Sequence, residues 1–132
     1  MVDCNAIFNQ VLAQSGTALD VLISGRVDYL QTPIGFVNSE ARVVYIPEGG
    51  QGETQAPIHE RDYLIHCYGG TSKHTDAEAV YRALFDLLNG LNMVTVASGV
   101  MLAGWEDQSS VPLIHPETGY PFVACRFGCR VR

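Results

Sequence analysis

The chain has 132 residues, 47% of them hydrophobic, and this predicts one domain over 1–132 with a core large enough to fold without metal or disulfide bonds. Seven arginines and one lysine face fourteen acidic residues, which gives a formal net charge of −6. A basic patch dense enough to hold phosphates is therefore excluded, and sequence-specific binding of DNA or RNA is not expected.

No segment has the pattern of a secretory signal or of a membrane-spanning helix. The N-terminus lacks a basic region followed by an apolar one. The longest mostly apolar stretch, 93–105, is interrupted by Thr, Ser and Gly and is shorter than the roughly 20 residues that span a bilayer. We therefore expect a soluble protein that is made in a cytoplasm and has no membrane partner.

Two helices are predicted at the start of the chain. Asp3 can cap the first, which is expected to run through Gln14 and to stop at Gly16. A shorter helical turn is predicted over 17–24, with one apolar face shared by Leu19, Leu22 and Ile23. The next stretch, 26–36, leads into a loop because it contains Pro and Gly.

A hairpin with a long tip follows. Two segments rich in Val, Ile and Tyr, 41–46 and 61–68, are predicted strands. The residues between them hold almost nothing that a core could bury. The simplest topology is an antiparallel hairpin with a long loop at 47–57, which would project on the order of 15 to 18 Å from the sheet.

The clearest helical pattern in the sequence lies at 75–91. Thr75 and Glu78 predict a capping box at its start, and Gly90 lies near its end. The apolar residues that repeat at helical spacing are Val80, Leu84, Leu87, Leu88 and Leu91.

Strands are predicted for the last third of the chain. Segments 93–98 and 100–106 are apolar, 112–121 is a connector rich in turn residues, and 122–132 alternates between apolar and polar positions. The order helix, strands, helix, strands predicts an α+β domain, with a mainly antiparallel β-sheet and two principal α-helices packed on it.

The four cysteines do not have the spacing of a metal site. Cys125 and Cys129 both fall on the apolar side of the alternating strand, and four residues along a strand span about 13 Å, too far for two ligands of one ion. Together with Cys4 and Cys67, they are expected to be buried, reduced thiols.

The candidate catalytic residues form no recognisable motif. The four histidines have no metal-site neighbour at helical spacing; they are His59, His66, His74 and His115. A nucleophilic Cys67 with a distant histidine stays open as an alternative to a buried Cys67, but His66 is excluded because neighbours in a strand point to opposite faces. Three acidic residues either gather a hard cation or are simply solvated: Glu106, Asp107 and Glu117. No catalytic residue, cofactor or metal ligand is assigned.

Charged residues predict a contact between copies of the chain. The hairpin tip carries Glu48 and Glu53, and the outward side of the last strand carries Arg126, Arg130 and Arg132. Arginines on one copy and acidic loops on the next are complementary, as a head-to-tail ring requires. The alternative is that the arginines only solvate an exposed strand and discourage edge pairing.

These motifs stand in a particular order along nearly the whole chain: an opening helix, GRVDYLQTP, ARVVYIPEG, a long loop, RDYLIHCYG, DAEAVYRALFDLLNGL and HPETGYPFVACRFGCRV. This order resembles the tail terminator or tail completion proteins of long-tailed bacteriophages, which cap the tail tube and join it to the head. The most suggestive part is PETGYPF followed by the alternating strand.

The resemblance implies a virion structural protein with a mixed α/β fold, no catalytic residues and no cofactor. It also implies a ring, usually of six subunits, whose partners are the tail tube protein and the head-tail connector protein, in the tail of a virion assembled in the host cytoplasm. DNA would pass through the lumen, and the hairpin tip would dock on a neighbouring ring. The alternatives are a small cytoplasmic hydrolase or thiol enzyme, and a monomeric protein-binding adaptor that uses the same loop.

Overall fold

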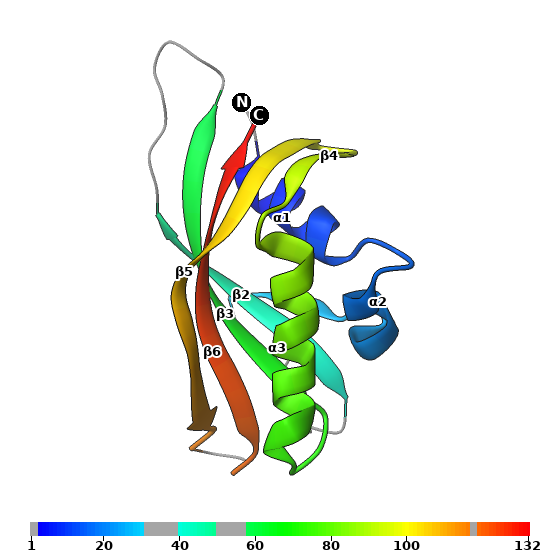
Figure 1. Cartoon of the computed structure of the whole chain (residues 1–132), viewed down its shortest axis with the longest axis vertical. Helices are drawn as coiled ribbons and strands as arrows, with labels where there is room; N and C mark the ends of the chain where they lie inside the picture. Colours follow the sequence, from blue (N-terminus) through cyan, green and yellow to red (C-terminus); the bar gives the residue numbers. More distant parts are fainter. Residues whose placement is uncertain (1–2, 31–39, 50–57, 117–118) are drawn as a thin grey trace.

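The computed structural model describes residues 3–30, 40–49, 58–116 and 119–132. In this part of the chain, three helices lie on one side of a six-stranded sheet (Figure 1). This arrangement confirms the predicted α+β class.

The first two helices, α1 (Cys4–Leu12) and α2 (Ala18–Ile23), occupy the predicted positions. The Asp3 carboxylate accepts a hydrogen bond from a first-turn N–H of α1 at 3.0 Å, and the Thr17 hydroxyl accepts one from α2 at the same distance. Each cap satisfies an N–H group that has no partner inside its helix. The buried face of α2 is narrower than predicted, because Leu22 is 39% exposed.

The long helix, α3 (His74–Leu88), is confirmed, but both of its ends differ from the prediction, and Leu91 lies beyond it. Its N-cap residue is Lys73, which makes no capping hydrogen bond with its side chain. The predicted capping box of Thr75 and Glu78 is wrong, because Thr75 already lies inside the first turn. Just before the helix, the Thr71 hydroxyl accepts a hydrogen bond from the Lys73 N–H at 3.1 Å.

The sheet has the strand order β1-β2-β3-β6-β5-β4. β1 runs parallel to β2, and the other neighbouring strands are antiparallel. The strands are β1 (Val27–Tyr29), β2 (Ala41–Gly49), β3 (His59–Gly69), β4 (Asn92–Val96), β5 (Gly99–Ile114) and β6 (Pro121–Val131). β2 and β3 form the predicted antiparallel hairpin, whereas most of the predicted tip at 47–57 lies outside the described residues.

Two strands differ from the prediction. The stretch 26–36, expected to lead into a loop, begins with β1. β5 continues to Ile114, so 112–114 belong to a strand that pairs with β6 and not to a connector. Proline is tolerated there because β4 pairs only with the first part of β5, and an edge strand needs no N–H on its outer side.

The main core lies between the helices and the sheet. Phe8 of α1 is fully buried, stacks on Tyr63 with ring centroids 4.0 Å apart, and meets Tyr45 edge-on at 5.4 Å. Cys125 and Cys129 of β6 also face this core, with 3% and 1% of their surface exposed. All four cysteines are free and buried, as predicted.

Candidate functional site

The second side of the sheet carries no helix among the described residues (Figure 1), although Val44, Tyr68 and Phe122 on this side are buried. We call it the open face. It is formed by alternate residues of the central strands: Arg42, Val44, Ile46 and Glu48 of β2; Glu60, Asp62, Leu64, His66 and Tyr68 of β3; and Phe122, Ala124, Arg126 and Arg130 of β6.

Two of the predicted interface residues, Glu48 and Arg126, meet on the open face of a single chain. Arg126 Nε lies 2.6 Å from Glu48 Oε2, and a second guanidinium nitrogen donates to the same carboxylate at 3.1 Å. The pair links the end of β2 to β6 across β3. Both side chains are about one-third exposed, so the pair contributes up to about 1 kcal/mol.

The other predicted interface residues lie apart from this pair. Arg130 forms an ion pair with Glu60, which is its direct neighbour in register on β3. Arg132 is exposed just beyond the end of β6. Glu53 lies outside the described residues. The role of these residues in a contact between copies stays a prediction, since the observed ion pairs form within one chain.

An acidic pair, Asp62 and Asp107, lies close to these arginines. Asp62 lies on β3 and Asp107 on β5, and β6 runs between these strands with Gly128 at this level. The Trp105 indole packs against Gly128. The indole N–H donates to Asp107 Oδ1 at 3.1 Å. Burial raises the pKa of Asp62, and so do its hydrogen bond with Asp107 and the Asp107 charge, while Arg126 acts in the opposite direction. Asp62 therefore keeps its proton to a higher pH than an isolated carboxyl group.

We expect Asp62→Asn to stabilise the fold at neutral pH by a few tenths to about 1 kcal/mol, because the amide removes the repulsion by Asp107. Since the pKa of Asp62 is raised in the folded state, protonated Asp62 stabilises the fold, and this stabilisation is lost as the pH rises through the folded pKa. The difference in free energy of unfolding between the variant and the wild type should therefore disappear as the pH falls toward about 4.

Urea denaturation at a series of pH values measures this difference. Asp86→Asn, at an exposed position of α3, is the matched control and should leave stability unchanged at every pH. A difference that stays constant down to acid pH would contradict the raised pKa of Asp62.

The packing of Trp105 on Gly128 gives a second prediction. A Cβ atom on Gly128 would lie 2.5 Å from Trp105 Nε1 and 2.6 Å from Cε2. Gly128→Ala should therefore lower the free energy of unfolding by about 1 to 3 kcal/mol. It should also change the fluorescence of Trp105, the single tryptophan. In a Trp105→Ala background the same change should cost much less, because the obstructing ring is gone. Equal costs in both backgrounds would contradict this packing.

The end of the open face near the β5–β6 turn is apolar. Val44, Tyr68 and Phe122 form a small cluster separate from the main core. A pocket of about 300 Å³ lies beside it, lined by Leu30, Val44, Ile46, His66, Tyr68, His115, Pro116 and Phe122. Burial lowers the pKa of His66, and His115 adds to this effect, so that neutral His66 suits its apolar surroundings.

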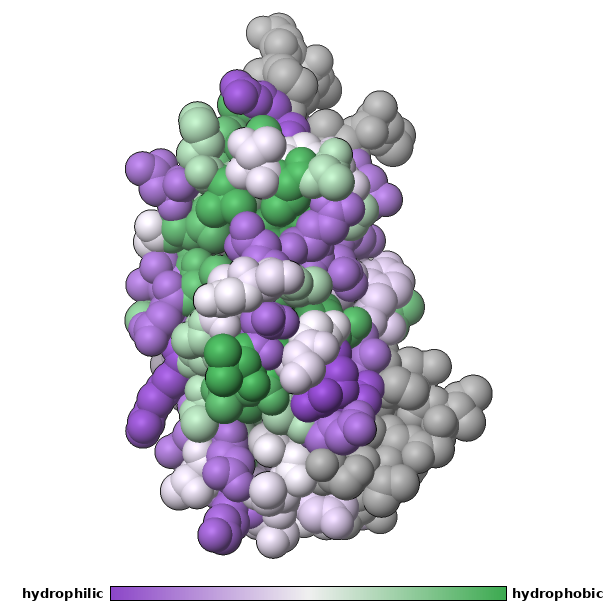
Figure 2. Space-filling view, turned by 90° about the vertical axis from the view of Figure 1, so that its right-hand side faces the viewer, coloured by the Kyte–Doolittle hydropathy of each residue, from purple (hydrophilic) through white to green (hydrophobic). Residues whose placement is uncertain are grey.

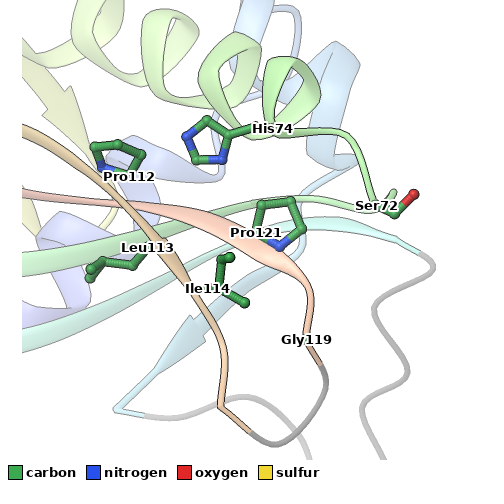
Figure 3. A pocket seen from close by; sticks show the side chains of 7 residues that line it. All are labelled: Ser72, His74, Pro112, Leu113, Ile114, Gly119 and Pro121. Carbon is green, nitrogen blue, oxygen red and sulfur yellow. The ribbon is translucent and has the colours of Figure 1, made fainter.

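A second hollow, which we call the β5 hollow, lies between the start of α3 and the end of β5 (Figure 3). Its volume is about 420 Å³, and its lining is Ser72, His74, Pro112, Leu113, Ile114, Gly119 and Pro121. Ile114 is 70% exposed and Leu113 is 42% exposed, so apolar side chains border solvent here. The sequence prediction missed this site because 112–121 was expected to be a connector. The signal that was available is the continuous apolar run at 111–114.

The structure places Cys67, the candidate nucleophile, in the core. Its side chain is completely buried, and its pKa is raised well above the ordinary value by the hydrogen bond with Cys125 and by burial. A thiol reacts as the thiolate, so Cys67 is protonated and inaccessible at neutral pH. His66 lies on the opposite side of the sheet, as predicted.

Two of the three acidic residues for which cation binding was left open, Glu106 and Asp107, make other contacts in the structure. Glu106 accepts a hydrogen bond from the Tyr81 hydroxyl, and burial together with Glu106 raises the pKa of Tyr81 to about 12. Asp107 accepts from Trp105, and Glu117 lies outside the described residues. Among the residues that the structure describes, no group of three His, Cys, Asp or Glu side chains could hold a metal ion. None of the described helices combines the length and the apolar character needed to cross a bilayer.

Comparison with known proteins finds a similar fold but no related sequence. No protein-family model and no curated protein matches the chain. The fold is similar to a chain in the solved structure "Virion of native gene transfer agent (GTA) particle", with a TM-score of 0.66 and 20% sequence identity. The match covers 95% of this chain and 90% of that chain. The similarity therefore concerns the complete fold and not a single shared motif.

Proposed function

We propose that the protein is a virion structural protein that forms a ring, caps the tail tube of a long-tailed phage or phage-like particle and joins it to the head connector. The observation that carries this proposal is the fold match to a chain of a gene transfer agent virion, which extends over 95% of this chain and 90% of the other. The order of sequence motifs supports the same conclusion independently.

In this proposal, the whole chain acts as one tail-terminator-like domain. Six copies surround a lumen through which DNA passes, one side of the ring binds the tail tube protein, and the other binds the head-tail connector protein. A net charge of −6 per copy suits this role, because a negative wall does not hold phosphates. Assembly takes place in the host cytoplasm, and the final location is the virion tail.

In this proposal, the charged part of the contact between subunits involves the open face and the hairpin. Arg130 and its partner Glu60 are 49% and 40% exposed in their side chains, and Arg132 is exposed beyond them. Acidic groups of a neighbouring hairpin, Glu48 and Glu53, would add to these pairs. Such a contact at a solvated surface weakens with salt.

Light scattering behind a sizing column, over a range of concentrations and at two salt levels, tests the proposal. A mass near six times 14.4 kDa that decreases at high salt is the expected result. If the protein is monomeric, purified tail tubes are added, and electron microscopy should then show rings at the tube ends. A monomer that binds neither itself nor tube ends would overturn the proposal in favour of an adaptor that acts as a single copy.

A further inference from the structure

Two apolar side chains stand out on the surface of α2. Val21 is 77% exposed and its neighbour Leu22 is 39% exposed, although α2 otherwise packs against the core with fully buried Leu19 and Ile23. We call Val21 and Leu22 the α2 knob. Figure 2 faces the side that carries the helices and shows hydrophobic areas between polar ones on this surface.

The β5 hollow and α2 lie in different regions of the molecule. Figure 1 shows α2 on the right, beyond α3, and the end of β5 at the lower left. β5 is next to the β4 edge of the sheet, and β4 accompanies only its first part, so the end of β5 borders solvent. In Figure 3, His74, Pro112, Ile114 and Pro121 surround a space that is open on one side.

The charges beside the two surfaces are complementary. Lys73, the single lysine of the chain, is exposed between Ser72 and His74 of the β5 hollow. Asp20 directly precedes Val21 in the α2 knob. A lysine at the start of a helix opposes the helix dipole, so the charge of Lys73 does not stabilise α3.

We propose that the α2 knob of one copy binds in the β5 hollow of the next copy, with Asp20 close to Lys73. This inference rests on the proposed ring and specifies one of its subunit contacts. Two different surfaces of one subunit form a heterologous interface, which closes into a ring when the rotation between subunits allows it. Apolar burial holds the contact, and the lysine offsets the repulsion between acidic copies.

Disulfide cross-linking tests the contact directly. Val21→Cys and Ile114→Cys are made as separate variants and mixed, in solution or with tail tubes, under mild oxidation. The native cysteines are all buried, so they do not compete. Cross-linked dimers should form in the mixture and should be absent from either variant alone. Cross-linking of Val21→Cys alone would indicate a symmetric contact and would overturn the inference, as would an assembled ring without any cross-link.

A substitution series provides the second test. Val21→Glu should reduce the mass from that of the ring toward 14.4 kDa, or abolish binding at tube ends, because it places a charge in the hollow. Lys73→Glu should weaken assembly about fivefold. Met93→Glu, at a position that is 59% exposed on β4, is the matched control and should leave assembly unchanged.

The outcomes separate this inference from the proposed function. A ring that forms normally in the Val21→Glu variant would overturn the contact and leave the ring itself intact. A wild-type protein that assembles neither alone nor on tail tubes would overturn the proposed function, and the contact with it.

Discussion

Phe8→Ala is expected to destabilise the fold by about 3 to 5 kcal/mol. The Phe8 ring is fully buried and stacks on Tyr63, with centroids 4.0 Å apart, while its edge contact with Tyr45 spans 5.4 Å. Removing it leaves a cavity where α1 meets the sheet and deletes both aromatic contacts. Urea denaturation of the purified variant at fixed protein concentration measures the change.

Phe8→Leu is the matched control, because it keeps an apolar side chain of similar reach and should cost much less than the alanine variant. Tyr63 also donates a hydrogen bond from its hydroxyl to Asn5 Oδ1 at 2.8 Å, which keeps the sheet side of this contact in place in both variants. If the two substitutions cost the same, the cavity is not the cause of the loss, and the importance of Phe8 as the anchor of α1 would be contradicted.

Gly69→Ala is expected to cost about 3 kcal/mol, at the upper end of the usual range for overpacking. A Cβ atom on Gly69 would lie 2.4 Å from the backbone nitrogen of Ala77 and 2.5 Å from the carbonyl carbon of Asp76. These are backbone atoms of the first turn of α3, so no side-chain rotation can relieve the collision. The start of the helix must move away from β3, and thermal or urea denaturation should report the loss.

Gly16→Ala is the control for the Gly69 experiment. Gly16 has a φ of +80°, but nothing lies within 4 Å of a Cβ atom placed there. Its replacement should cost only the conformational strain, about 1 to 2 kcal/mol. Because the displaced turn carries His74 and borders the β5 hollow, Gly69→Ala should also weaken ring assembly. Equal effects of both substitutions would contradict the close approach of α3 to β3.

The two proposed contact regions use different physical forces, which allows them to be studied separately. The open face carries ion pairs that are partly exposed, so a contact made there responds to salt. The α2 knob and the β5 hollow are mainly apolar, so the contact between them should persist at high salt. The salt dependence of the ring mass, measured for wild type, therefore reports the contribution of the open face.

Features that repeat along a single helix or strand could be predicted from the amino-acid sequence. The alternation through 122–131 placed Cys125 and Cys129 on the buried side of β6, and the helical spacing identified the buried side of α3. These predictions succeed because the period of a strand or a helix is a local property, and burial follows from it. The hairpin of β2 and β3 was predicted for the same reason, since its strands are neighbours in the chain.

Contacts between residues of different strands could not be predicted in this way, because they depend on the order and register of the strands. Asp62 of β3 reaches Asp107 of β5 because β6 lies between these strands and has Gly128 at the crossing point. Arg126 meets Glu48 for a similar reason, across β3. β5 continues past Pro112 because β4 no longer accompanies it there and a missing N–H costs little at an edge, although the composition of 112–121 predicts a turn. Strand order and register are long-range properties, and local patterns in a sequence do not encode them.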